Sequence, residues 1–172
     1  ALLLTRSPET GDCRTGTNYA QTVDLRVPRE VFGEVASTPL VRRHSDAASI
    51  AGLVKEGSVQ VVKVASHRKL PLALGRGEAA AIRLWFDSDG DLLLSDDGRA
   101  IRTCRILRLP FTSSPRVVVD LYRCGAIRLN RARRALEMLA VAGRYSRDVV
   151  AAALTALQEE HEDDQADNDP SL

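Results

Sequence analysis

The chain has 172 residues, enough for one domain with a substantial core, and 44% of them are hydrophobic, as in soluble globular proteins. Its formal net charge is only +1, but seven of its 23 acids lie in the last fourteen residues, which leaves 24 Lys and Arg against 16 acids elsewhere, a charge of about +8. A basic body suits a polyanion such as RNA, although arginine-rich helices can equally be solvated faces.

Membrane insertion and secretion are not indicated by the sequence. No stretch approaches the roughly eighteen apolar residues of a membrane span, and the opening run ALLLTRSPETG is too short in apolar length for a signal peptide. Cys13, Cys104 and Cys124 show no metal-ligand spacing, and their odd number without a disulfide pattern predicts a reducing compartment. We therefore expect a cytoplasmic protein, with Cys104 and Cys124 in core positions.

The first half of the chain predicts few elements clearly. Residues 1–11 make a poor strand, because Pro8 removes a ladder donor and Gly11 weakens the end. A helical stretch opens at Pro39 and ends at Glu56, and Ser58–Val64 alternates like a strand towards the sheet edge.

The middle of the chain is the most regular part. Apolar residues predict helices over Ala79–Phe86 and Arg99–Arg108. Between them, Leu92–Leu94 is wholly apolar, as expected for a central parallel strand, and Leu109–Phe111 begins another extended segment.

The last third predicts helices and a polar tail. Ser114 and Pro115 open one helix, and Asn130–Ala142 is a second. A third helix follows Ser146. The acidic segment 159–172 is expected to be disordered, so that one domain covers residues 1–158.

Three carboxylates lie at points where an α/β sheet binds ligands. Asp96 and Asp97 come directly after the apolar strand, and Glu78 lies in the first turn of the preceding helix. Converging carboxylates repel each other at low dielectric, and a hard divalent cation, Mg²⁺ or Mn²⁺, would relieve that repulsion. An acidic turn of this kind is also common as a plain solvated turn.

Several runs, taken in order, resemble the PIN-domain family. The pattern is similar to that of the VapC-type toxin relatives, and no single motif in it is very specific. The resemblance extends upstream through Val31–Val35 and downstream to about Leu157. The runs that carry it are LGRGEAAAI from Leu74, LLLSDDGRAIR from Leu92, LRLPFTSS from Leu107 and a helix that ends in Gly125-Ala126-Ile127.

The resemblance implies a three-layer α/β/α fold with a central, mainly parallel sheet. It also implies hydrolysis of RNA phosphodiesters with bound Mg²⁺ or Mn²⁺. Relatives have an aspartate after their first strand, and spacing assigns that place to Asp12. The implied metal ligands are Asp12, Glu78, Asp96 and Asp97, and the implied catalytic set is Asp12, Glu78 and Asp97.

Other implied positions depart from the family pattern. Relatives carry a glutamate about three residues after the position of Val41, where this chain has His44, a poorer ligand for a hard cation. Ser114 falls on a threonine of the relatives' small-residue turn, and is an accessory candidate as well as a helix-capping one. Family spacing makes Val23–Val31 helical, and Gly33–Ser37 is expected to be a short strand and turn.

The partners implied are an RNA substrate, an antitoxin protein that inserts into the acidic crevice, and a second copy of the chain in a homodimer. Arg99 and Arg102 follow the acids, and can orient a phosphate or simply face solvent. Two alternatives stay open. One is a degenerate PIN domain that serves as a binding or regulatory module. The other is a flavodoxin-like phosphoacceptor protein, which would need a lysine at a later strand end that the sequence lacks there.

Overall fold

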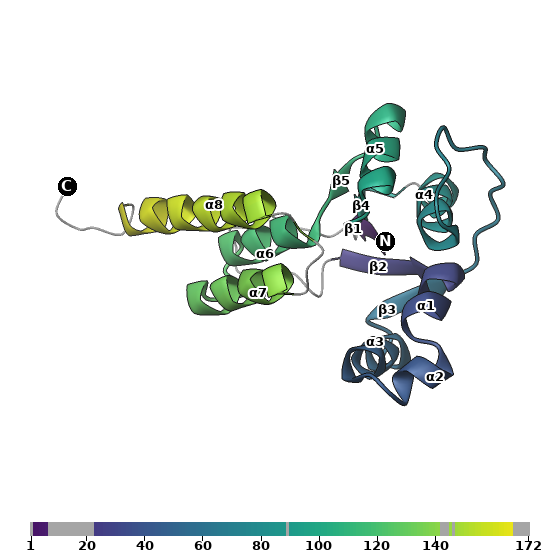
Figure 1. Cartoon of the computed structure of the whole chain (residues 1–172), viewed down its shortest axis with the longest axis horizontal. Coiled ribbons are helices and arrows are strands. Elements are labelled where there is room, and N and C mark those ends of the chain that lie inside the picture. The colour runs from purple at the N-terminus through teal and green to yellow at the C-terminus, as the bar shows by residue number, and fades with distance from the viewer. Residues whose placement is uncertain (1, 7–22, 89, 142–144, 146, 167–172) are drawn as a thin grey trace. The chain divides into compact units, whose positions relative to one another are not determined.

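The computed structural model describes residues 2–6, 23–88, 90–141, 145 and 147–166 (Figure 1). The chain divides into two compact units, one of residues 1–10 and 21–112 and one of residues 11–20 and 113–172. The single domain expected over residues 1–158 stays a prediction, because compactness alone does not measure independent folding.

The first unit contains a five-stranded sheet. Its order is β3-β2-β1-β4-β5, in which β2 pairs in parallel with β3 and β4 in parallel with β5, while β1 is antiparallel to both neighbours. Four strands therefore run one way and β1 alone runs the other. The strands are β1 Leu2–Arg6, β2 Val23–Pro28, β3 Val59–Val62, β4 Leu92–Leu94 and β5 Phe111–Thr112.

The register of β1 fixes where its two ends lie. Leu2 is opposite Leu94, at the carboxyl end of β4, whereas Arg6 is opposite Val23, where β2 begins. The chain therefore leaves β1 at the end of the sheet far from Asp96.

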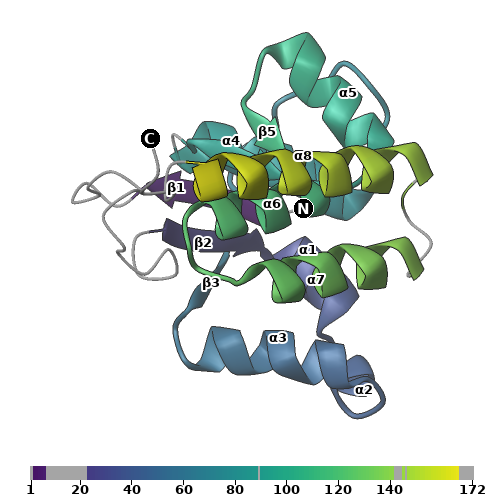
Figure 2. The ribbon, with the colours of Figure 1, turned by 90° about the vertical axis from the view of Figure 1, so that its left-hand side faces the viewer.

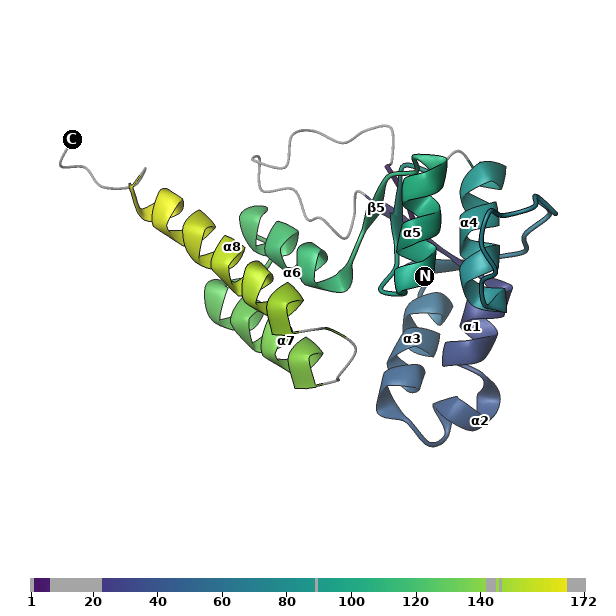
Figure 3. The same ribbon diagram turned by 45° about the horizontal axis from the view of Figure 1, so that its top comes forward.

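The described residues of the first unit form five helices. Helices α1 and α4 pack against each other and against the sheet. Helix α5 lies beside α4 (Figure 3), and α2 adjoins α3 (Figure 2). Ile82 of α4, Leu93 of β4 and Cys104 of α5 share one core, fully buried. The helices are α1 Arg29–Val35, α2 Thr38–Val41, α3 Ser45–Lys55, α4 Arg76–Ser88 and α5 Gly98–Leu107.

Two expectations for residues 23–37 are wrong. The segment from Val23 is strand β2 rather than a helix, because alternating apolar residues pair with β1 and β3, and Pro28 ends the strand at the N-cap of α1. Residues 33–35 are helical rather than extended, since α1 continues to Val35 and buries Val31 against the Val27 core. The predicted helices at 79–86 and 99–108 and the edge strand near 58–64 are confirmed.

The residues that are described in the second unit form three helices, α6 Ser114–Arg123, α7 Leu129–Val141 and α8 Arg147–Ala166, which pack on one another (Figure 1). Ala132, Leu136 and Leu157 form its fully buried centre. Helix α8 continues past Glu159 to Ala166, so the first part of the acidic segment expected to be disordered is helical; residues 167–172 lie outside the described range.

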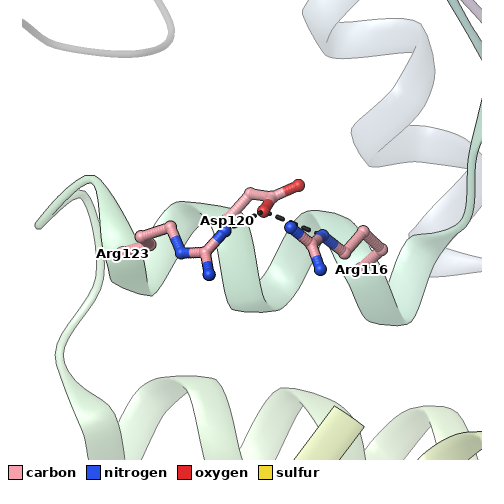
Figure 4. A network of polar contacts seen from close by, with 3 residues as sticks. All are labelled: Arg116, Asp120 and Arg123. Atoms are coloured by element: carbon pink, nitrogen blue, oxygen red, sulfur yellow. Dashed lines mark ion pairs between the residues drawn. The ribbon is translucent and has the colours of Figure 1, made fainter. Parts of the chain in front are cut away.

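A small ionic network lies on α6. The Nε of Arg116 lies 3.0 Å from Oδ1 of Asp120, and an Nη of Arg123 lies 3.9 Å from the same oxygen (Figure 4). All three side chains are at least partly solvated, so each pair contributes only about 0.5 kcal/mol or less.

The cysteines divide into two kinds. Cys104 is a free thiol that is fully buried in the core of the first unit, as expected. Cys124 is disulfide-bonded and half-buried, so the expectation of cysteines without a disulfide is wrong for this residue. Within the described ranges, no helix combines the length and apolar character that a bilayer crossing requires.

Candidate active site

The carboxylates after β4 are placed by the strand and by the helix that follows. Ser95 is buried, and its hydroxyl accepts a hydrogen bond from the backbone N–H of Asp97 at 3.3 Å. Asp97 is the N-cap of α5: its Oδ1 accepts from the N–H groups of Arg99 at 2.9 Å and Ala100 at 2.8 Å. One oxygen of Asp97 therefore caps the helix. Asp96 and Asp97 are both exposed.

Glu78 lies in the first turn of α4, half-buried, and its carboxylate folds back against Gly75. A side chain at residue 75 would occupy the space of the Glu78 Oε2. This backward turn resembles that of the glutamate in a helix capping box, and the positive end of the helix dipole favours a carboxylate there. The sequence therefore needs glycine at position 75 if Glu78 is to keep this position.

Glu34 is a site residue that the sequence reading missed. Its Oε2 lies 2.6 Å from the position that a Cβ on Gly77 would occupy, at the same first turn of α4. The expectation of a strand at 33–37 hid this acid. The spacing of the family glutamate was the available signal. Relatives carry a glutamate about three residues after an apolar helix position, and Glu34 stands three residues after the buried Val31 on α1. The same spacing from Val41 leads to His44 instead.

The remaining predicted residues do not join this group. Asp12 lies outside the described residues. His44 is exposed at the N-cap position of α3 and forms no side-chain capping bond. Ser114 is the first residue of α6, with Ser113 as N-cap, and it belongs to the second unit. Pro115 is at the start of this helix, as predicted, and is buried.

An open pocket of about 620 Å³ borders Asp97. Its lining combines the first turn of α5, including Arg99 and Arg102, with the segment that leads to α4. Ala73 of that segment stands two residues before Gly75, so the approach to the Glu78 turn and the Asp97 cap border the same space. The lining residues are Leu72, Ala73, Asp97, Gly98, Arg99 and Arg102.

A buried hydroxyl lies next to the strand ends. Thr112 ends β5, and only 8% of its surface is exposed. Its carbonyl accepts from the N–H of Ser95 at 3.1 Å, whereas its Oγ1 has no hydrogen-bond partner among the described residues. A buried hydroxyl without a hydrogen-bond partner costs stability. The backbone pairing of Thr112 with Ser95 in the sheet keeps the hydroxyl in this buried position.

The chemical type of these side chains suits a hard divalent cation. Carboxylate oxygens are the ligands Mg²⁺ and Mn²⁺ take, and Glu34 and Glu78 both lie at one helix turn that has glycines where side chains would displace them. Across the described ranges, no three His, Cys, Asp or Glu residues are close enough together to hold a metal by themselves. This arrangement fits Mg²⁺, which commonly binds through one or two carboxylates together with waters and substrate phosphates.

Comparison with known proteins adds one finding. A family model for the PIN domain matches residues 20–160, which include every described element except β1 and the last residues of α8. No curated protein and no solved structure gives a significant match.

Proposed function

Because the chain belongs to the PIN-domain family, a fold typical of nucleases, we propose that it is a metal-dependent endoribonuclease that hydrolyses RNA phosphodiesters. The observation that carries the proposal is the placement of Glu34 and Glu78. The Glu34 carboxylate lies against Gly77 in the first turn of α4, and the Glu78 carboxylate lies against Gly75 just before that turn, so both acids are near the start of α4. A separate open pocket borders Asp97 and is lined by Leu72 and Ala73 of the segment that leads to α4.

Glu34, Glu78 and Asp97 are the candidate ligands for Mg²⁺ or Mn²⁺, and one or two of them would bind an ion together with waters and substrate phosphates. A bound divalent ion lowers the pKa of a coordinated water and neutralises charge that develops on phosphate oxygens. Asp97 would contribute the oxygen that does not cap α5. Asp96, which was also predicted as a ligand, is exposed beside it.

Arg99 and Arg102 are the residues that would orient the substrate. Both are exposed, and both line the pocket that Asp97 borders. A guanidinium group can donate two parallel hydrogen bonds to a phosphate, which fixes its orientation as well as its charge. In this proposal the arginines bind the RNA backbone next to the acids.

The biological role proposed is that of the toxin in a toxin–antitoxin pair. It rests on the likeness of the central motifs to VapC-type relatives, and it includes a cytoplasmic location, an antitoxin that covers the acidic site, and a homodimer. Co-expression with the gene that adjoins it in its genome, followed by copurification and light scattering, would test these partners together.

A degenerate PIN domain, retained as a binding or regulatory module, is the second candidate. The direction of β1 favours it. Because Arg6 lies at the end of the sheet far from Asp96, the described first strand does not lead to the edge where the other acids lie. A site that lacks a first-strand acid would have fewer negative charges to hold the ion.

Two measurements test the first proposal against the second. We would titrate Mn²⁺ calorimetrically into the wild type and into Glu34→Gln, Glu78→Gln and Asp97→Asn, with Glu56→Gln, an exposed acid at the end of α3, as control. RNA cleavage would be followed with the same proteins. We expect binding and cleavage in the wild type and the control, and loss of both in the site variants. Absence of Mn²⁺ binding to the wild type at millimolar concentration would support the degenerate module instead.

A further inference from the structure

Helix α5 carries four arginines in a row that starts beside Asp97. Arg99, Arg102, Arg105 and Arg108 recur at every third residue, and all four are exposed. In an α-helix each step of three residues advances about 4.5 Å and turns back by about 60°. The row therefore winds slowly around one side of α5, away from the pocket that Arg99 and Arg102 line.

The core contacts of α5 lie on the other side of the helix. Ala100, Thr103 and Cys104 are fully buried, and Leu107 packs against the same core. By helical spacing the mean direction of these four residues is opposite to that of the arginines, although Thr103 lies only about 40° around the helix from Arg99. All four arginines are exposed, so their guanidinium groups can meet a partner from solvent.

The charge of this row is not balanced by any ion pair among the residues that the structure describes. In the described part of the chain, none of the four arginines forms an ion pair. The sequence gives the reason, since residues 98–119 contain five arginines and no acid. Arg116 and Arg123 on α6 differ, because they share Asp120. Uncompensated guanidinium groups in a row create a positive potential that attracts a polyanion.

The far half of the row is also partly ordered. The guanidinium of Arg105 lies over the ring of Phe111, 5.5 Å from its centre. Arg108 is the C-cap of α5, in the left-handed region with φ of 54°. A cation over an aromatic face is held in position while its N–H groups stay available, which suits backbone recognition by arginine.

We propose that Arg99, Arg102, Arg105 and Arg108 form a track for the phosphate backbone of single-stranded RNA, so that the strand bound beside Asp97 continues along α5. This rests on the proposed function for the identity of the ligand, and it assigns substrate binding to Arg105 and Arg108. A single row of cations matches the phosphates of one strand. With aromatic residues only 4% of the chain, backbone contacts rather than base stacking supply the affinity.

The test is the salt dependence of binding. We would measure affinity for a fluorescent oligouridylate in EDTA over a series of NaCl concentrations, for the wild type, Arg105→Gln/Arg108→Gln and Arg116→Gln/Arg123→Gln. Both double variants remove two positive charges, but only the first removes unpaired ones. With about 0.7 of slope per phosphate contact in single strands, the first variant should reduce the slope of log K against log salt by about 1.4. The second should keep the wild-type slope.

A charge-preserving variant and a site variant make the result specific. Arg105→Lys/Arg108→Lys should recover the wild-type slope, and thermal unfolding would establish that each variant is folded. Glu78→Gln should bind with the wild-type slope even without cleavage, so that failure of the nuclease proposal and failure of the track are distinguishable. Equal slopes for the two glutamine variants would overturn the proposal. So would unchanged RNA binding together with lost binding of an acidic peptide, which would assign the row to a protein partner.

Discussion

The Oε2 of Glu34 lies 2.6 Å from the point at which a Cβ on Gly77 would stand. Helices α1 and α4 are separated by more than forty residues in the chain. They contact each other where α1 has the carboxylate of Glu34 and α4 has a glycine, which has no side chain. Glycine at 77 leaves the room that the carboxylate occupies, and Gly75 does the same for Glu78.

Gly77→Ala should separate metal binding from stability. The nearest atom to the new methyl group is the end of a flexible side chain, so Glu34 can turn away, while Val31 Cγ2 at 3.1 Å must give slightly. Alanine also suits a helix better than glycine by about 1 kcal/mol. We expect a free energy of unfolding within about 1 kcal/mol of the wild type, but Mn²⁺ affinity lower by about tenfold or more.

Gly52→Ala is the matched control for that substitution. Gly52 lies inside α3, and a Cβ there would meet no atom within 4 Å. It should raise the free energy of unfolding by about 0.5–1 kcal/mol and leave Mn²⁺ affinity unchanged. Equal Mn²⁺ affinities for Gly77→Ala and Gly52→Ala would show that Glu34 does not contact the ion.

Asp97 has an observed role as a helix cap and a proposed role as a metal ligand, and two substitutions can separate them. Its carboxylate caps α5 through Arg99 and Ala100. Asparagine is about as good an N-cap as aspartate, whereas alanine costs about 1 kcal/mol. Chemical denaturation should therefore show loss of stability for Asp97→Ala and little change for Asp97→Asn. Mn²⁺ affinity should fall in both, because both remove the negative charge. Normal Mn²⁺ binding by Asp97→Asn would contradict the proposed metal-binding role of Asp97 and leave helix capping as its function.

The regular centre of the chain was predictable, and its first quarter was not. Leu92–Leu94 and the helices on either side have strong apolar patterns, and the structure places strand and helices there. From Val23 to Val35 the pattern is short, and Pro28 fits either a break or a helix start. Family spacing made Val23–Val31 helical where the structure has β2, and the separate expectation of a strand at 33–37 placed Glu34 outside helix α1.

Of the three candidate site acids, Glu78 and Asp97 were predicted from the sequence and Glu34 was not. Glu78 and Asp97 were found because each stands next to a regular element in the sequence. The approach of Glu34 to Gly77 is a contact between distant segments, and no periodicity within either segment reports it. The direction of β1 is of the same kind, since it depends on pairing with β2 and β4 rather than on its own residues.

Leu136→Ala should show whether the two compact units are energetically linked. Leu136 is fully buried among Ala132 and Leu157, so its truncation should cost about 2–5 kcal/mol. Val141→Ala, on the same helix and 87% exposed, should change stability by about 0.5 kcal/mol or less. Hydrogen exchange would measure the effect. If the units unfold separately, protection should fall in α6–α8 and persist in α4 and α5, whereas a uniform loss would mean that the chain unfolds as one body.

The Cys104 thiol gives the stability a predictable dependence on pH. Burial raises the pKa of Cys104 above its ordinary value. The native state therefore keeps the thiol proton while the unfolded state releases it above about pH 8.5. The stabilisation from Cys104 is complete below that pH and is lost as the pH rises towards the pKa of the folded state. We expect the difference in unfolding free energy between the wild type and Cys104→Ala to be constant from pH 6 to about 8 and to shrink by about pH 10. A difference that stays constant through this range would mean that the thiol ionises equally in both states.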